Sequence, residues 1–361
     1  MKKILFSAVN LEMGGIEKAL VMLLNKLASK YKITLVLEEK KGIFLDKLNP
    51  SIEILEFKPN NFKFALLRKS INYIKQQNFK RKYKNKFDFS CSFATYSRPG
   101  SFVARTASNN CILWCHMDYL AQYKGQKQKV KEFFDNVKFE EFKKLIFVSR
   151  KSKDTFLSVF PEMDKKVEHI NNMIDYEEIL NLAEESIPEK IEKNQTIFVN
   201  VSRHMEEQKR ISRIIESAKI LKNENQNLKI ILVGEGPDTK KYKEMAEKEN
   251  LKDELIFVGN KKNPYPYIKL ADYLILTSDY EGSPVTFVEA FVLNTPVITT
   301  DVSGAEQVEK KYGIVVEKDV NKIAEAMNFA INNGYKIQKR FDAKRYNEEI
   351  LNKLEKIVEG K

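Results

Sequence analysis

The chain has 361 residues, of which 43% are hydrophobic and 31% are charged, and its formal net charge is +12. This length predicts two domains, and no run approaches the roughly 20 apolar residues that a membrane-spanning helix needs. The chain has three cysteines, an odd number, so we expect buried, reduced thiols in a cytoplasmic protein. The three histidines are scattered along the sequence, so we expect no zinc site.

The N-terminal segment predicts a buried strand, a glycine-containing loop and a helix. Residues 4–9 are a continuous apolar run, as expected of a strand covered on both faces. Gly14 and Gly15 follow and precede a run with helical periodicity. This pair either lets the backbone approach a ligand closely or forms a simple turn. The dinucleotide fingerprint G-x-G-x-x-G is absent.

Residues 62–87 form a basic stretch with interleaved aromatic residues. Within it, apolar residues recur at helical spacing at Phe64, Leu67, Ile71 and Ile74. The stretch is either a solvated basic helix or a helix that lies on an anionic membrane surface. Positive charge alone would also suit nucleic acid, but no DNA- or RNA-binding module is evident, so we expect no such partner.

A histidine follows the predicted strand at residues 111–115. The carboxyl ends of strands are where ligands collect in open α/β sheets, so His116 is a candidate site residue, although isolated histidines are more often structural. Asp118, two residues later, either contacts an acceptor or caps the next helix.

The second half opens with a predicted strand at residues 196–201 and a loop that carries two cations. Arg203 and Lys209 are six residues apart in this loop. An arginine can grip a diphosphate with its planar fork and a lysine can bind it as a point charge. Surface charge alone would also account for either residue.

The most informative stretch is residues 280–290. The apolar run 273–276 predicts a buried strand before it, Ser283 is predicted to cap a helix, and Pro284 to be the first helical residue. The free N–H groups and the positive dipole end of that helix would favour an anion.

Two carboxylates flank this expected anion site. Glu281 lies in the loop and Glu289 lies within the helix. A carboxylate is a poor partner for phosphate and a good acceptor for paired hydroxyls, so the set suits a nucleotide sugar. Taken alone, the two residues are better explained as a solvated loop acid and a first-turn acid favoured by the helix dipole; the nucleotide-sugar interpretation depends on the rest of the chain.

These motifs, in this order, resemble those of the retaining glycosyltransferases of the GT4 family, which have the GT-B fold. Glu281 and Glu289 match the family's Glu-x7-Glu signature, and Arg203 and Lys209 match its Arg-x5-Lys. Arg210 stands where the family often has glycine. The first half matches less closely, through a Gly-Gly-x-Glu loop and a histidine: Gly14, Gly15, Glu17 and His116.

The resemblance implies an α/β chain of the GT-B class, with two Rossmann-like doubly wound domains facing a central cleft. Residues 1–178 would bind the acceptor and residues 195–339 would bind the nucleotide sugar. Residues 176–194 would link them. The last segment, residues 340–361, would cross back to the first domain.

The resemblance also implies transfer of a hexose-type sugar from a nucleoside diphosphate sugar, with UDP as the default, and with retention of configuration. Arg203 and Lys209 would stabilise the leaving diphosphate. Glu281 would hold sugar hydroxyls, Glu289 the ribose, and His116 would contact the transferred sugar. Further donor contacts would come from Gly14, Gly15, Gly259, Asn260, Ser283, Val285 and Thr286.

No Asp-x-Asp occurs in the sequence, so we expect no metal and no cofactor. The expected acceptor is a glycan or lipid-linked hydroxyl in bacterial cell-surface polysaccharide synthesis, which would place the protein in the cytoplasm or on the inner face of the plasma membrane. Two alternatives stay open: a GT-B sugar-nucleotide epimerase, and an inactive partner subunit that binds nucleotide or glycan. The intact cations and carboxylates favour transfer.

Overall fold

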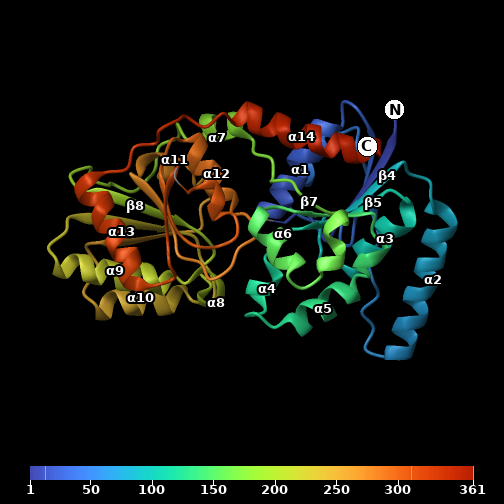
Figure 1. Ribbon diagram of the computed structural model, residues 1–361, viewed down its shortest axis with the longest axis horizontal. Helices are drawn as coiled ribbons and strands as arrows, with labels where there is room; N and C mark the ends of the chain where they lie inside the picture. The colour runs from blue at the N-terminus through green and yellow to red at the C-terminus, as the bar shows by residue number, and fades with distance from the viewer. Residues whose placement is uncertain (13, 310, 361) are drawn as a thin grey trace. The chain divides into compact units, whose positions relative to one another are not determined.

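The computed structural model describes residues 1–12, 14–309 and 311–360. The chain divides into two compact units, Met1–Met173 with Asn347–Lys361, and Ile174–Tyr346. Each unit is built on one parallel sheet with helices packed against it (Figure 1). No helix among the described residues has the length and hydropathy needed to cross a bilayer. All three cysteines are free and buried, as predicted.

The first unit contains a seven-stranded sheet in the order β3-β2-β1-β4-β5-β6-β7, with parallel neighbours throughout. Because β1 lies between β2 and β4, the chain winds outward from its first strand in both directions, which is the doubly wound order. The strands are β1 (Lys3–Ala8), β2 (Lys32–Leu37), β3 (Glu53–Glu56), β4 (Phe89–Ser92), β5 (Cys111–Cys115), β6 (Lys144–Phe147) and β7 (Val167–His169).

Helices cover both faces of this sheet. The strands β1 and β2 are therefore buried at every position after their first residue, which explains their continuous apolar sequence. The helices are α1 (Gly15–Leu27), α2 (Ala65–Tyr83), α3 (Arg98–Ala107), α4 (Tyr119–Gln122), α5 (Lys127–Asn136) and α6 (Arg150–Leu157), with short 3-10 turns η1 (Leu45–Lys47), η2 (Phe139–Glu141) and η3 (Pro161–Lys166).

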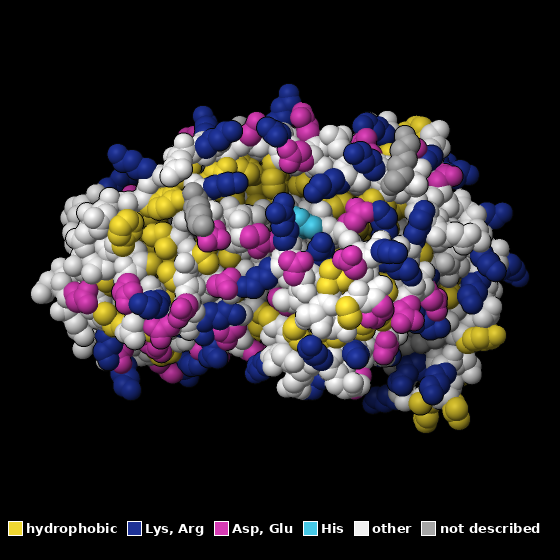
Figure 2. All heavy atoms as spheres, viewed as in Figure 1, with side chains coloured by type: hydrophobic (Ala, Val, Ile, Leu, Met, Phe, Trp, Pro, Cys, Tyr) yellow, Lys and Arg dark blue, Asp and Glu magenta, His cyan; other side chains and the backbone are white. Residues whose placement is uncertain are grey.

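Helix α2 is the basic segment that the sequence predicts, and Phe79 is the one buried residue among its described residues. Phe79, near its C-terminus, is buried against Phe57 and Phe102 in an aromatic cluster of the first unit. The first turns of α2 leave their apolar side chains exposed. Figure 2 shows hydrophobic and basic side chains gathered at that end of the helix, at the lower right of the view.

The second unit contains a six-stranded parallel sheet in the order β10-β9-β8-β11-β12-β13. Its first strand also lies inside the sheet, so the predicted pair of Rossmann-like doubly wound folds is confirmed. The strands are β8 (Thr196–Val201), β9 (Leu228–Val233), β10 (Leu255–Gly259), β11 (Tyr273–Leu276), β12 (Val297–Thr300) and β13 (Gly313–Val316).

Two hydrophobic clusters lie on opposite faces of this second sheet. In β11, Leu274 belongs to one cluster and Ile275 to the other, because successive side chains of a strand point to opposite faces. The helices that complete the clusters are α7 (Tyr176–Leu182), α9 (Ile211–Asn223), α10 (Thr239–Lys248), α11 (Tyr265–Leu270), α12 (Val285–Val292) and α13 (Val320–Asn333). The unit also contains the short helix α8 (Glu206–Lys209) and a 3-10 turn, η4 (Ala305–Gln307).

The segments predicted to join the units are both helical in part. The expected linker, residues 176–194, begins with α7 and lies in the second unit. The last helix, α14 (Ala343–Glu359), begins in the second unit, and its residues from Asn347 onward belong to the first.

Candidate active site

The candidate residues of the second unit lie at one edge of its sheet. Arg203 follows β8, Gly259 ends β10, and Glu281 follows β11. Because all these strands are parallel, their carboxyl ends meet at the same edge, where ligands bind in sheets of this kind. The N-terminus of α12 begins at this edge too.

Glu281 and Lys209 form a largely buried ion pair at this edge. Glu281 is 6% exposed, and its Oε1 lies 2.6 Å from Lys209 Nζ. The Ser278 hydroxyl donates to the same oxygen at 2.7 Å, and Gln208 Nε2 approaches the other at 3.5 Å. The two residues expected to bind the sugar and the diphosphate are therefore paired with each other.

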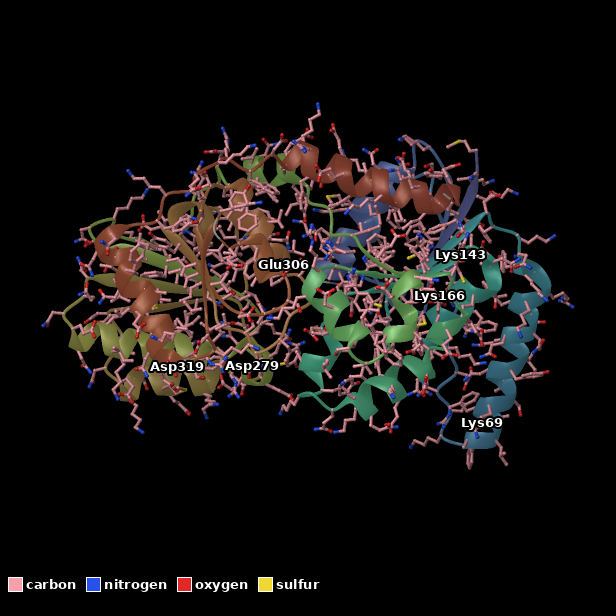
Figure 3. The ribbon with its side chains drawn as sticks, in the orientation of Figure 1. Lys69, Lys143, Lys166, Asp279, Glu306 and Asp319 are labelled. Atoms are coloured by element: carbon pink, nitrogen blue, oxygen red, sulfur yellow. The ribbon has the colours of Figure 1, made fainter. Side chains whose placement is uncertain are left out.

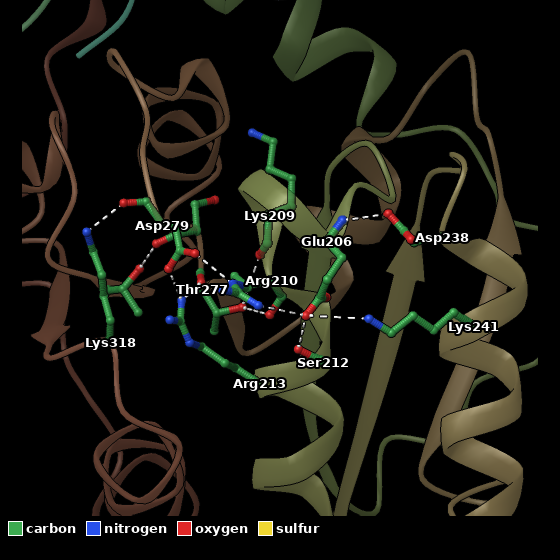
Figure 4. Close-up of polar contacts among 12 residues, drawn as sticks. Glu206, Lys209, Arg210, Ser212, Arg213, Asp238, Lys241, Thr277, Asp279 and Lys318 are labelled. Atoms are coloured by element: carbon green, nitrogen blue, oxygen red, sulfur yellow. Dashed lines mark hydrogen bonds and ion pairs between the residues drawn. The ribbon is translucent and has the colours of Figure 1, made fainter. Parts of the chain in front are cut away.

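A second ionic network fixes the backbone beside this pair (Figures 3 and 4). Asp279 accepts from Arg210 Nε at 2.6 Å and pairs with Arg213 at 2.7 Å. Arg210 also reaches Glu206 at 3.2 Å. The backbone N–H of Asp279 donates to the Gln208 carbonyl at 2.7 Å. These contacts tie the segment that carries Lys209 to the loop that carries Glu281.

The backbone at Arg210 has a conformation that suits glycine. Arg210 has φ +49° and ψ +47°, in the left-handed region, where a side chain costs about 1–2 kcal/mol. Its ion pairs with Asp279 and Glu206 offset that cost. Glycine would take the same backbone conformation without strain, but it would lose both contacts.

Asp279→Asn is expected to lower the free energy of unfolding at neutral pH by about 1–2 kcal/mol, given the partial exposure of the pairs. Burial opposes ionisation of Asp279, but hydrogen bonds from Arg210 and Arg213 hold its pKa below the usual 3.8. The stabilisation is therefore present above pH 3.8 and is lost as pH falls toward the lower folded value.

Urea unfolding of both proteins at several pH values tests this prediction. The difference between wild type and Asp279→Asn should shrink as the pH falls below 3.8. Asp253→Asn, which changes an exposed aspartate, is the matched control and should behave like wild type. A pH-independent difference would assign the effect to packing rather than charge.

Glu289 lies on α12 with its carboxylate buried. It is 7% exposed, and its Oε1 accepts from the Tyr265 hydroxyl at 3.2 Å. Burial and the nearby Glu289 charge raise the pKa of Tyr265, so the phenol stays protonated and donates. Tyr265 therefore orients one oxygen of the carboxylate that is expected to bind ribose.

The predicted cap of α12 is wrong. The N-cap residue is Pro284, with φ −58° and ψ 119°, and helical residues begin at Val285. Because Pro284 itself is extended, the helix begins one residue later than predicted, and the Ser283 hydroxyl instead accepts from Gln307 Nε2 at 2.9 Å. Among the described residues no side chain caps this helix start, so the N–H groups of its first turn, at Val285 and Thr286, have no side-chain partner of that kind.

The remaining second-unit candidates are more exposed. Arg203 is exposed, and its side chain has no ion-pair partner in the described part of the chain. The structure therefore does not pair Arg203 with Lys209. Gly259 has φ +74°, which favours glycine, and Asn260 after it is exposed.

The glycine pair of the first unit lies at the start of α1. Gly14 is its N-cap, with an extended backbone that any residue can adopt. A Cβ there would lie 2.1 Å from Glu17 Oε2, the end of a flexible side chain, so a larger residue would require only that Glu17 move. Gly15 is the first residue of the helix. Burial raises the pKa of the neighbouring Glu17.

His116 follows β5 directly and is 8% exposed. Its ring packs against Phe93, with centroids 4.5 Å apart, and stacks with Trp114. Neither ring nitrogen has a hydrogen-bond partner among the described residues, which is unusual for a buried polar group. Burial lowers the pKa of His116 to about 3, so the imidazole is neutral at physiological pH. Asp118 caps α4, accepting from the Ala121 N–H at 3.0 Å.

Several contacts at the site could not be read from the sequence. Tyr265, Ser278 and Gln208 hold the two carboxylates, and Asp279 holds the arginines. The only local signal is position, since Gln208 precedes Lys209 and Ser278 lies three residues before Glu281. Within the described residues, no group of three or more histidine, cysteine, aspartate or glutamate side chains is placed to hold a metal ion.

Comparison with known proteins agrees with the fold. Residues 183–348, nearly the whole second unit, match the family described as "Glycosyl transferases group 1". The crystal structure of Anabaena HepE in complex with UDP and glucose is similar over 98% of this chain and 100% of that chain, with a TM-score of 0.76 and 18% identity. The fold is therefore GT-B, and the family match supports a glycosyltransferase.

Two curated relatives extend the comparison. An uncharacterized glycosyltransferase of Methanocaldococcus jannaschii is 29% identical over 200 residues, which is 54% of this chain and 49% of that protein. The N-acetylgalactosamine-N,N'-diacetylbacillosaminyl-diphospho-undecaprenol 4-alpha-N-acetylgalactosaminyltransferase of Campylobacter jejuni is 24% identical over 332 residues, covering 88% of this chain and 87% of that protein.

Proposed function

We propose that the chain is a retaining glycosyltransferase that moves a hexose-type sugar from a nucleoside diphosphate sugar to an acceptor hydroxyl. The observation that carries the proposal is the site at the carboxyl edge of the second sheet. There a lysine, an uncapped helix start and two buried carboxylates lie on adjoining elements. The first two suit a diphosphate, and the carboxylates suit hydroxyl groups.

The main task of the protein in this reaction is to stabilise the negative charge of the leaving diphosphate. Cleavage of the bond between the sugar and the diphosphate leaves negative charge on the phosphate oxygens. Lys209, Arg203 and the first N–H groups of α12 would stabilise this charge. Lys209 would exchange its ion pair with Glu281 for one with the phosphate, which frees a Glu281 oxygen for a sugar hydroxyl.

Retention and the choice of UDP rest on the GT4 resemblance. The front-face mechanism often proposed for that family requires no nucleophile from the enzyme. Glu281 can therefore hold sugar hydroxyls without attacking the sugar. His116, neutral and unpartnered in the described residues, would offer a hydrogen bond to the transferred sugar. Gly14 and Gly15 would face the donor phosphates and Gly259 and Asn260 the base.

For the acceptor we propose a glycan or lipid-linked hydroxyl of bacterial cell-surface polysaccharide synthesis. One relative, by its name, acts on a diphospho-undecaprenol-linked sugar. A lipid-linked acceptor would bring the enzyme to the inner face of the plasma membrane as a peripheral protein, and the basic helix α2 supports this location.

Thermal denaturation with a panel of nucleoside diphosphates and nucleotide sugars tests the donor. A ligand at 100 times its dissociation constant should stabilise the protein by about 2.7 kcal/mol. We expect a selective shift with UDP or a UDP-sugar, unchanged by EDTA. A shift that requires metal would contradict the metal-free mechanism, and no shift with any nucleotide would contradict the donor site.

Product analysis then separates transfer from the alternatives. A transferase releases free UDP only when the sugar is passed to an acceptor, or to water in place of the acceptor. An epimerase would convert the sugar without net release of UDP. An inactive partner subunit would give the thermal shift without either product.

A further inference from the structure

The first turns of α2 carry apolar side chains that the fold does not bury. Six large hydrophobic residues, which lie in the first turns of α2 or just before the helix, are 50% to 83% exposed: Phe62, Phe64, Leu66, Leu67, Tyr73 and Ile74. These side chains lie outside the hydrophobic core of the first unit, because α2 packs against that core through Phe79 near its other end. Exposed apolar patches of this kind mark interaction sites.

The helix geometry collects most of these side chains on one face. Leu66 and Tyr73 are seven residues apart, as are Leu67 and Ile74, which is close to two helical turns. Phe79 lies on the other side of the helix, against Phe57. The outward face therefore has a defined direction, away from the sheet.

The charge of the segment is of one sign. Residues 62–87 contain nine lysines and arginines and no aspartate or glutamate. Among the described residues, none of these nine side chains forms an ion pair with a carboxylate. Lys69 lies at the exposed end of α2 (Figure 3), beside the hydrophobic side chains visible there in Figure 2. The partner must therefore accept apolar side chains and carry negative charge.

We propose that the outward face of α2 docks on an anionic lipid surface. Leu66, Leu67 and Ile74 would enter the boundary between headgroups and acyl chains, and Lys63 and Lys69 would bind the headgroups. A second copy of this face would bring like charges together. Nucleic acid would satisfy the charges but would leave the leucines without partners.

The most densely charged part of α2 is not the part that is free to enter a membrane. The densest charge lies at residues 80–86, but Tyr83 and Phe87 there pack into the aromatic cluster of the first unit. Insertion must then occur at the other end of α2. The inference deepens the membrane part of the proposed function, yet vesicle binding is measured without donor or acceptor, so it can fail or succeed independently of sugar transfer.

Vesicle sedimentation of the full chain tests the proposal. Wild type should sediment with vesicles of phosphatidylcholine and phosphatidylglycerol and remain in solution with phosphatidylcholine alone. Leu66→Ser/Leu67→Ser/Ile74→Ser should lower the partition coefficient at least about tenfold. Its melting temperature should not change, because these side chains are exposed. The matched control, Leu180→Ser/Phe329→Ser, changes exposed apolar residues of the second unit and should bind like wild type.

A fluorescent variant gives a second readout. Trp114, the single tryptophan, is 1% exposed and supplies a constant background. In Tyr73→Trp, anionic vesicles should shift the emission to the blue. Unchanged emission, equal sedimentation of the triple variant, or no sedimentation of wild type would overturn the proposal. A triple variant that alters the oligomeric mass but not vesicle binding would overturn it in favour of self-association.

Discussion

Lys209→Ala is expected to remove most of the transfer activity and also to destabilise the second unit. Loss of one donor that stabilises transition-state charge typically lowers kcat by about 10²–10³-fold. The variant also leaves Glu281 buried without its cation. Breaking such a pair should cost about 2–4 kcal/mol in the free energy of unfolding, since both side chains are mostly buried.

The two effects can be separated with a double variant. Lys209→Met/Glu281→Gln removes both charges, so no unpaired charge stays buried and the stability should return close to that of wild type. Its activity should remain low, because the diphosphate still lacks the lysine. UDP release and urea unfolding measure the two quantities on the same preparations.

Lys241→Ala is the matched control for this prediction. Lys241 borders the same network, 3.9 Å from Glu206, but its side chain is half exposed. Its loss should change neither activity nor stability by much. If Lys209→Ala kept full kcat while losing stability, the lysine would be a structural partner of Glu281 and would have no direct role with the donor.

The regular elements could be predicted from the sequence because each depends on neighbouring residues. The apolar run 273–276 corresponds to β11, and 196–201 corresponds to β8. Buried parallel strands are apolar at every position, so such runs stand out against charged helices. The strand–loop–helix order then placed Glu281 in a loop and Glu289 in a helix.

The contacts could not be predicted because they join residues far apart in the chain. Lys209 and Glu281 are 72 residues apart, and nothing local shows that their charges meet. For α2, the helical spacing predicted the element, but it did not show that Phe79 alone is buried while Leu66 is exposed. The predicted Ser283 cap is wrong because Pro284 takes an extended ψ and the Ser283 hydroxyl accepts from Gln307, which is 24 residues away.

Glu289→Gln is expected to weaken UDP binding by about tenfold to 200-fold. The change keeps the shape of the side chain but removes its charge, and hydrogen bonds to a charged group contribute about 1.5–3 kcal/mol. Calorimetric titration of UDP measures the loss. The fold should be retained, because a glutamine oxygen can still accept from the Tyr265 hydroxyl.

A nucleotide that lacks the ribose 2′-hydroxyl makes this test specific. Wild type should bind UDP more tightly than 2′-deoxy-UDP, since the deoxy ligand cannot donate a hydrogen bond from that position to the Glu289 carboxylate. In Glu289→Gln the preference should largely disappear, while Tyr265→Phe, which leaves the charge in place, should keep much of it. An equal preference in wild type and Glu289→Gln would mean that Glu289 does not contact that hydroxyl. In that case its buried carboxylate, and the Tyr265 bond that orients it, would serve the structure of α12 instead.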